Sequence, residues 1–587
     1  MKTKIRDYGI ILLFTVIMLI PLFNSNFNIY RDDGIQHIAR LMGTQQSIAE
    51  DGIFSNIMSN FCNGFGYSWN IFYSPLTAYV PLIFGIFISS FELMLKLFIL
   101  LVVFASGIAM YEFVKRVTQN SSTALLASII YVLVPYRFTD IYMRMAISEL
   151  ASFVFLPIVF HGMYLLLGTE LFLGTEQKNS KEVKASESEE SLKNSSSEND
   201  CFKSIIILTI GATGLILTHT IITMYTAIFC LIYLLVHIKR LKEKRVWAII
   251  GVSVLLILLL SAFYIVPLIE HMASTDYEVF KPGRMERTDA MTYYKVDVLD
   301  LFYTPNGEMS FEIGLLTLIG LVFTPLAFKK IGKEYKKTYL FFLIAGIVCV
   351  IMSLRFFPFE KLPGILKMIQ FTFRLLEFSS FFFAIVAAIN YSIVIKNFRM
   401  RDVIVLGVIA LLLIVPLCRN INFDKRWSED KLWPAVGVDE NTGRVHAGCA
   451  TFEYLPSKAF DNLEYIKQRE NRAYILGGNA DIENENKNGT NMTLDVSNVE
   501  ENTVVELPYI YYLGYTVEVT NGNGDTQKVD TFESENGFVA ISVTQDAKTI
   551  SVQYTGTVAM WVSLVVSSLT LVGLVGYKVG VLIRRKH

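Results

Sequence analysis

The sequence is poor in charge and in patterned cysteines. Asp, Glu, Lys and Arg make up 18% of its 587 residues, against about 25% in a typical soluble protein. None of its six cysteines follows the CxxC or CxxxC spacing of metal and redox motifs, so they indicate neither a metal centre nor a disulfide framework. The net charge of −1 is uninformative by itself, and we expect no nucleic-acid partner.

Signatures of nucleotide chemistry are also missing. The sequence contains no Walker A motif, no GxGxxG after a strand, no HExxH and no GxSxG. Chemistry on cytosolic nucleotides is therefore not expected, and a reaction would have to take place at the outer face of a membrane.

Long apolar runs are what the sequence has instead. Apolar residues make up 53% of the chain and the mean hydropathy is +0.44. Several runs of about 17–25 residues are nearly free of charge, which is the length that crosses the hydrocarbon core. The first run, 8–23, lacks a small-residue cleavage site, which favours a retained helix over a signal peptide. These features predict a polytopic α-helical membrane protein.

Basic clusters define a predicted topology. If they mark the cytoplasmic face, about twelve transmembrane helices follow, with both termini cytoplasmic. The run 75–89 is short and contains two prolines, so we interpret it as re-entrant or interfacial rather than as a thirteenth span. The clusters lie at residues 2–6, 115–116, 178–203, 239–245, 329–337, 396–401 and 584–586.

Three regions follow from this topology. The polar block 419–557 is predicted to be extracytoplasmic and β-sandwich-like from about residue 500, because "GFVAISV" and "KTISVQYTG" alternate with period two. "NADIENENKNGTNMT" is predicted to be a loop, and a cap or docking surface is the simplest role for the block. The regions are a transmembrane domain 1–418 (outer loops 24–92, 136–147, 268–310 and 355–373; disordered cytoplasmic loop 174–200), the extracytoplasmic domain 419–557, and a C-terminal transmembrane helix with its tail, 558–587.

The first candidate site is "RDDGIQHIAR", directly after the first apolar run. A helix starting near Asp32 would place Asp33, His37 and Arg40 on one face, with Asp32 as its N-cap. A solvated amphipathic helix is the simpler alternative. The aromatic stretch that follows, "NGFGYSWNIFYSP", favours a sugar or lipid surface.

The second candidate is "PYRFTDIYMRMAISE", which contains Arg137, Asp140, Arg144 and Glu149 at the outer ends of two predicted helices. Ionisable residues at this depth are costly and usually line a cavity or a substrate path. An Arg–Asp pair that only ties the corner together is the alternative.

Two further positions lie at outer helix ends. His219 in "LTHT" occupies a turn between apolar helices, where a hydrogen-bonded structural histidine is the simpler interpretation. Arg374 and Glu377 in "IQFTFRLLEFSS" are three residues apart where a helix re-enters the membrane, and they could simply snorkel and pair.

These segments, in this order, resemble the YfhO-like bacterial membrane proteins and the neighbouring family labelled pyruvoyl-tetrahydropterin synthase-related. Both families are similar to GT-C glycosyltransferases. The resemblance rests on "YRDDGIQHIAR", "VPYRFTDIYMRMAISELASFVFLPIVF", "GLILTHTIITMYTAIF", "IQFTFRLLEF" and "YIYYLGYTVEV". The segment "QFTFRLL" keeps the arginine of the more usual Gln-Phe-Pro-Trp-Arg form but lacks its proline and tryptophan.

The resemblance implies a GT-C-like fold in a bacterial cell membrane. It implies a polyprenyl-phosphate-linked sugar as donor, a cell-envelope glycopolymer as acceptor, and an acidic residue of the first outer loop as base in an inverting single displacement. Some GT-C enzymes bind a divalent cation near this position, so a metal is left open. The residues implicated are Asp32 and Asp33 as catalytic candidates, Arg137, Arg144 and Arg374 as donor-phosphate ligands, and His37, Arg40, Asp140, Glu149, His219 and Glu377 in support.

Two other classes of function stay open. A transporter or flippase for a lipid-linked glycan usually shows two similar halves and charges at the midplane of broken helices. The sequence shows no internal repeat, and its charges cluster at one membrane edge. A non-catalytic scaffold would tolerate replacement of Asp32 and Asp33.

Overall fold

The computed structural model describes residues 2–52, 56–167, 187–281, 295–333, 335–424, 437–438, 445–446 and 452–584. The chain divides into two compact units. Unit 1 comprises Met1–Arg31, Lys96–Leu258 and Glu286–Lys425, and unit 2 comprises Asp32–Leu95, Leu259–Met285 and Arg426–His587. This division differs from the sequence-based one, because most of the first outer loop and the end of one membrane helix belong with the C-terminal region.

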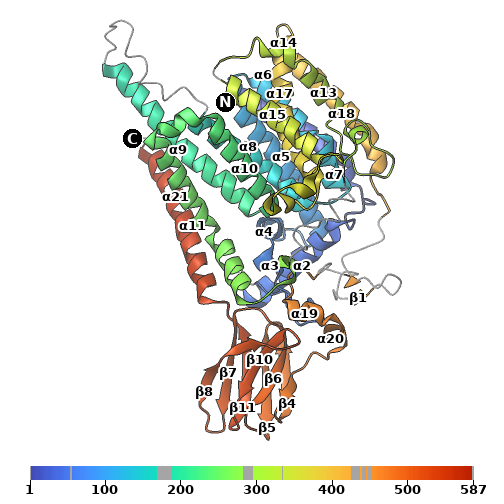
Figure 1. Ribbon diagram of the computed structural model, residues 1–587, viewed down its shortest axis with the longest axis vertical. Helices are drawn as coiled ribbons and strands as arrows, with labels where there is room; N and C mark the ends of the chain where they lie inside the picture. The colour runs from blue at the N-terminus through green and yellow to red at the C-terminus, as the bar shows by residue number, and fades with distance from the viewer. Residues whose placement is uncertain are drawn as a thin grey trace. The chain divides into compact units, whose positions relative to one another are not determined.

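Unit 1 is helical (Figure 1). Over the described part of the whole chain, eight helices are long and apolar enough to cross a membrane, or nine if a bent pair counts as one span. The polytopic α-helical class is therefore confirmed at this level. The helices of unit 1 are α1 (Lys2–Leu19), η1 (Ile20–Phe23), α5 (Phe91–Thr118), α6 (Ser121–Val132), α7 (Pro135–Tyr142), α8 (Ile147–Leu167), α9 (Glu187–Ile216), α10 (Thr220–Val236), η3 (Ile238–Lys242), α11 (Lys244–Ser274), η5 (Val298–Leu301), α13 (Leu315–Val322), α14 (Thr324–Phe328), α15 (Lys336–Ser353), η6 (Phe359–Lys361), α16 (Gly364–Lys367), η7 (Thr372–Arg374), α17 (Leu375–Val394), α18 (Met400–Ile414) and η8 (Val415–Asn420); α5 and α11 each continue into unit 2.

Helix α17 forms the centre of unit 1, since its most apolar stretch is completely buried. Small residues allow neighbouring helices to approach it closely. A Cβ atom on Gly320 of α13 would lie 2.6 Å from the Cβ of Ala387, and one on Gly346 of α15 would lie 2.4 Å from the ring of Phe383. A larger residue at either glycine would force the helices apart, and with them the start of α17.

A break between α6 and α7 changes the direction of the chain. The two helices are bent by 41° relative to each other. Val134 is extended (φ −64°, ψ 137°) and Pro135 is the first residue of α7. Proline restricts the preceding residue to extended conformations and has no N–H to donate, so it favours a helix start. This break fixes the position of Arg137 and Asp140 on α7.

The tract 174–200 differs from its prediction. Helix α9 begins at Glu187, so residues 187–200 are helical rather than disordered, and 174–186 lie outside the described residues. Glutamate, leucine and lysine are good helix formers, and this part of the tract leads directly into the apolar end of α9.

Unit 2 combines helices of varied length with a β-sandwich (Figure 1). Helix α4 covers most of the run 75–89, and its nine residues measure about 14 Å, less than half of a hydrocarbon core. Its helical elements are α2 (Asp33–Asp51), α3 (Trp69–Phe72), α4 (Leu76–Phe84), the end of α11, η4 (Glu278–Phe280), α19 (Ser457–Asp461), α20 (Leu463–Gln468) and α21 (Val558–Arg584).

The sandwich consists of two antiparallel sheets, β3-β6-β10-β9 and β4-β5-β11-β7-β8. A separate short pair is formed by β1 (Gly437–Val438) and β2 (Val445–His446). The strands of the sandwich are β3 (Tyr474–Gly477), β4 (Asp481–Asn488), β5 (Asn491–Ser497), β6 (Thr503–Ile510), β7 (Tyr515–Asn521), β8 (Thr526–Val529), β9 (Thr531–Glu533), β10 (Phe538–Val543) and β11 (Ala547–Tyr554).

The predicted start of the sandwich near residue 500 is wrong, and so is the predicted loop at "NADIENENKNGTNMT". The sandwich starts at Tyr474, and β4 and β5 form a hairpin that turns at Gly489 (φ +60°). Strand β4 is at the edge of its sheet and its residues are mostly exposed. An edge strand of this kind needs no apolar alternation, so the period-two pattern missed it.

The first outer loop packs into the sandwich. The ring of Phe65 lies 5.1 Å from that of Phe538, and its carbonyl accepts a hydrogen bond from Ile510 N (2.9 Å). Tyr67 and Trp69 are also buried. The aromatic stretch that favoured a sugar or lipid surface is therefore core, because large rings gain most by burial.

Lys487 fastens the same loop. Its ammonium donates to Gly64 O (2.5 Å), Asn471 Oδ1 (2.7 Å) and Pro508 O (2.7 Å). Burial and the nearby charge of Arg469 lower the pKa of Lys487 to about 7. The protonation state of Lys487, which links the loop to the sandwich, therefore changes with pH near neutrality.

Candidate functional site

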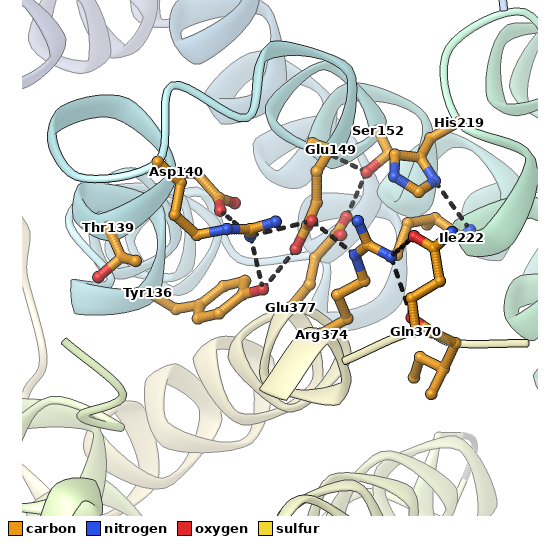
Figure 2. A network of polar contacts seen from close by, with 12 residues as sticks. Tyr136, Thr139, Asp140, Glu149, Ser152, His219, Ile222, Gln370, Arg374 and Glu377 are labelled. Atoms are coloured by element: carbon orange, nitrogen blue, oxygen red, sulfur yellow. Dashed lines mark hydrogen bonds and ion pairs between the residues drawn. The ribbon is translucent and has the colours of Figure 1, made fainter. Parts of the chain in front are cut away.

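A buried charge cluster forms where several helices of unit 1 begin (Figure 2). Glu149 lies in the first turn of α8 and Glu377 in the first turn of α17, while Arg374 ends η7 directly before α17. Carboxylates are favoured at helix N-termini by the helix dipole. Local structure therefore places the Glu149 carboxylate beside Arg374 and the Glu377 carboxylate beside Ser152 of α8.

Glu149 is the centre of the cluster. Its Oε2 accepts from Arg144 Nη1 and from Arg374 Nε, each at 3.0 Å, and its Oε1 accepts from the Tyr136 hydroxyl. Arg144 Nη1 also lies 2.8 Å from Asp140 Oδ1. Glu149 is 1% exposed. At such burial each charge depends on its partner, because an unpaired charge loses hydration without compensation.

Neighbouring groups hold the two paired arginines and Glu377. Arg374 Nη1 donates to Ile369 O (3.0 Å) and Gln370 Oε1 (2.7 Å). The Arg144 guanidinium lies 4.9 Å from the centre of the Phe373 ring. Ser152 Oγ donates to Glu377 Oε1 (2.5 Å). Both arginines are thus fixed by contacts in addition to their ion pairs.

Arg137 differs from Arg144 and Arg374 in its hydrogen bonding. It is fully buried, donates from Nη1 to Ser106 Oγ (2.9 Å), and stacks on Tyr131 (4.6 Å) and Phe153 (4.3 Å). Its Nε and Nη2 atoms have no hydrogen-bond partner within the described part of the chain. These two groups form one edge of the planar guanidinium, the kind of paired-donor edge that binds carboxylate or phosphate through two hydrogen bonds. Its charge interacts with those of Asp140 and Glu377.

His219 adjoins the cluster (Figure 2). It is the N-cap of α10, and its Nδ1 accepts from Ile222 N at 3.3 Å. This confirms its predicted place in a turn between two helices. The cap is a structural role, and the ring also lies within electrostatic range of Glu149 and Arg374.

Asp32 and Asp33 lie in unit 2, at the start of α2. The predicted helix is confirmed, since α2 runs Asp33–Asp51 with Asp32 at the N-cap position. The predicted capping role is wrong, because the Asp32 side chain makes no capping hydrogen bond. Its backbone has φ +49° and ψ −122°, a strained conformation for a residue with a Cβ atom that costs about 1–3 kcal/mol. Asp32 is exposed.

Arg40 supports the first loop from within unit 2. Its guanidinium is 2% exposed and donates to Asn70 Oδ1 (3.1 Å), Tyr73 O (3.0 Å) and Ser74 O (3.2 Å). The ring of His37 lies 6.4 Å from that of Tyr73. Burial and the charge of Arg40 lower the pKa of His37 to about 3, so this histidine is neutral at physiological pH.

The candidate residues therefore form two groups. Unit 1 brings together the three arginines with Asp140, Glu149, His219 and Glu377, whereas Asp32, Asp33, His37 and Arg40 belong to unit 2. Sequence reasoning missed Tyr136, Ser152 and Gln370. Two of these had a signal: Tyr136 precedes Asp140 by one helical turn on α7, and Gln370 is the first residue of "QFTFRLL".

The described residues offer a divalent cation no ligand set. No group of three or more His, Cys, Asp or Glu side chains is placed to hold a metal ion within the described ranges.

Comparison with known proteins gives a distant relative. No family model matches the chain. An uncharacterized protein of Lactococcus lactis subsp. cremoris (strain MG1363) is 24% identical over 584 aligned positions, which cover 92% of this chain and 89% of the relative. The chain is thus similar to a bacterial protein over a length that includes both units.

Proposed function

We propose that the chain is an integral membrane glycosyltransferase of the GT-C type. It moves a sugar from a polyprenyl-phosphate-linked donor to a cell-envelope glycopolymer at the outer face of a bacterial cell membrane. The observation that carries the proposal is the unused Nε–Nη2 edge of Arg137, buried where α5, α7 and α8 meet. A buried guanidinium with two idle donors is costly, and a phosphate oxyanion matches that edge in charge and shape.

The proposed reaction is a single displacement. Asp32 or Asp33 takes the proton of an acceptor hydroxyl as its oxygen bonds to the anomeric carbon. The bond from that carbon to the phosphate oxygen breaks, the anomeric centre inverts, and polyprenyl phosphate leaves with the electron pair. Arg137, with Arg144 and Arg374, stabilises the charge that builds on the phosphate in a water-poor site.

The finer topology is part of the proposal. Helices α9 and α10 and the short pair α13–α14 are apolar, and counting them as spans gives about twelve. Both termini are then cytoplasmic. Asp32 and the N-terminal ends of α8 and α17 face outward, which agrees with basic residues at the opposite ends of these helices.

A flippase for a lipid-linked glycan is the second candidate. The bent pair α6–α7 carries Arg137 and Asp140 just after its break, and broken helices with buried charges are typical of transporter binding sites.

The test compares cells that lack the protein with cells that express Asp32→Asn, Asp33→Asn or Arg137→Lys. Mass analysis measures lipid-linked sugars and envelope polymers. We expect one aspartate variant to abolish the envelope sugar, and Arg137→Lys to lower it about 100-fold, because lysine keeps the charge and loses the paired donors. Arg401→Gln, an exposed arginine of α18, is the control.

The side on which the donor accumulates separates the two candidates. A failed transferase leaves the lipid-linked sugar accessible from outside, whereas a failed flippase leaves it on the cytoplasmic leaflet. Full modification in both aspartate variants and in Arg137→Lys contradicts the transferase proposal.

A further inference from the structure

A second anion site can be inferred at another place in unit 1. A cavity of about 230 Å³ lies between α6, α13 and α18. Leu133, Leu316 and Ala410 are among the apolar residues that line it, and Glu312 and Arg419 are its charged lining residues. The cavity is therefore an apolar space with an adjoining charged edge.

The cavity opens at the surface that faces lipid. Its lining residues Tyr303 and Leu315 are 60% and 53% exposed. Only 28% of the most apolar stretch of α18 and η8 is buried inside the protein. In a membrane protein, an exposed apolar helix face of this kind contacts lipid chains. An opening there admits a lipid chain more readily than a water-soluble ligand.

Arg419 lies at the end of η8, away from the basic residues at the start of α18. Its side chain is exposed, its Nη2 donates to Thr304 O (2.5 Å), and its guanidinium lies 5.6 Å from the Tyr303 ring centre. Interfacial arginine and tyrosine are typical of the depth at which lipid headgroups lie. The guanidinium of this exposed residue is thus held beside the cavity.

The rim that holds Arg419 is built into the fold. Asn420 accepts from Gly307 N (2.9 Å) and donates to Pro305 O (3.3 Å). Ser310 N donates to Thr139 Oγ1 (2.8 Å), which in turn donates to Ser310 O (2.7 Å). These bonds attach the loop 302–314 to η8 and α7, so the rim is fixed by specific hydrogen bonds.

We propose that this cavity binds one acyl chain of an anionic membrane phospholipid whose headgroup phosphate pairs with Arg419. Apolar lining matches the chain, and the exposed cation matches the phosphate. Glu312 opposes an anion, but it accepts a hydrogen bond from Thr304 Oγ1 (2.7 Å), and burial raises the pKa of its carboxyl group. The proposal stands without the transferase assignment, which gives the donor phosphate to Arg137.

The test uses the purified full-length protein in a zwitterionic detergent. Phosphatidylglycerol, phosphatidylcholine, undecaprenyl phosphate or inorganic phosphate is titrated, and the melting temperature and the native mass are measured. We expect phosphatidylglycerol to raise the melting temperature saturably and to add one lipid mass. Arg419→Gln should weaken its apparent affinity about tenfold, since a charge-assisted hydrogen bond is lost.

Two matched variants complete the design. Arg401→Gln removes an arginine that is 88% exposed at the other end of α18 and should leave phosphatidylglycerol binding unchanged. Ala410→Leu fills the cavity and should weaken phosphatidylglycerol binding even with Arg419 in place.

Each contrary result overturns the proposal. If Arg419→Gln binds phosphatidylglycerol as tightly as the unaltered protein does, Arg419 does not contact the headgroup. If Ala410→Leu binds it equally well, the acyl chain does not occupy the cavity. If phosphatidylcholine or inorganic phosphate raises the melting temperature as much as phosphatidylglycerol does, the site is not specific for an anionic lipid. Tighter binding of undecaprenyl phosphate assigns the cavity to the donor lipid instead.

Discussion

Replacing Arg137 and Arg144 by methionine, one at a time, compares a buried charge without an ion pair with a buried charge that is paired. Both side chains are buried, and both substitutions remove one positive charge from the cluster. Arg144 pairs with Asp140 and Glu149, whereas Arg137 has no ion pair within 4.0 Å among the described residues. The two variants should therefore differ sharply in stability and agree in loss of function.

The magnitudes follow from the contacts. Arg137→Met loses a charged hydrogen bond to Ser106, about 1.5–3 kcal/mol, and stacking on Tyr131 and Phe153, about 0.5–2 kcal/mol each. It also removes two buried unpaired donors, each of which costs about 1–3 kcal/mol. These contributions nearly cancel, so the free energy of unfolding should change by less than about 2 kcal/mol.

Arg144→Met leaves Asp140 without a partner. Asp140 Oδ1 accepts from Arg144, and its Oδ2 has no hydrogen-bond partner among the described residues. Removing one member of a buried pair costs about 3–5 kcal/mol. Arg144→Met should therefore unfold at a clearly lower temperature than Arg137→Met, and adding Asp140→Asn should recover part of the loss.

The assay is thermal unfolding of the purified variants in detergent, together with analysis of envelope sugar in cells. We expect Arg137→Met to keep the melting temperature and lose the sugar. If Arg137→Met is destabilised as much as Arg144→Met, Arg137 has a structural partner and its idle edge carries no argument for an anion site.

Further expected outcomes concern unit 2 and the topology. Asp32→Gly should stabilise unit 2 by about 1 kcal/mol, since glycine relieves the positive φ. If Asp32 rather than Asp33 is the base, this variant should also abolish the envelope sugar. Destabilisation in thermal unfolding would show that the aspartate side chain is structural. Burial lowers the pKa of Lys487 to about 7, so the unfolded state binds more protons than the folded state between about pH 7 and 10.5, and the free energy of unfolding should rise with pH there. Lys487→Met should remove this slope when unfolding is measured over a pH series. An unchanged slope contradicts the assignment of the pH dependence to Lys487. On intact cells, Thr526→Cys should react with an impermeant thiol reagent and Lys330→Cys should not. The native Cys62 is fully buried and should react only after unfolding. Labelling of both introduced cysteines would contradict the topology.

Local patterns in the sequence predicted the parts of the fold that depend on local physics. Hydropathy predicted the eight or nine described helices that are long and apolar enough to cross a membrane, because the length of an apolar run is a property of the run itself. The spacing of Asp33, His37 and Arg40 predicted α2, and "LTHT" predicted the turn at His219. Each of these depends on residues within two turns of one another.

The parts that failed depend on distant partners. Arg374 and Glu149 are 225 residues apart, and no local pattern pairs them. Arg144 lies beyond the end of α7, so it does not reach Asp140 by standing on the same helix. The aromatic residues after Cys62 gave the same pattern for a sugar surface as for a core, and only the sandwich from the far end of the chain decides between them.

The stability cost of each charge distinguishes the candidates better than their residue types do. Glu149 and Arg144 are buried but mutually paired, so their charges are compensated within the protein without a ligand. Arg137 keeps an idle donor edge in a buried position, and Asp32 keeps a strained backbone without capping its helix. No hydrogen bond among the described residues offsets the cost at Arg137. If a ligand offsets the cost at Arg137 and chemistry requires the strain at Asp32, replacing either residue will harm function more than stability, which is the reverse of the result expected for a structural charge.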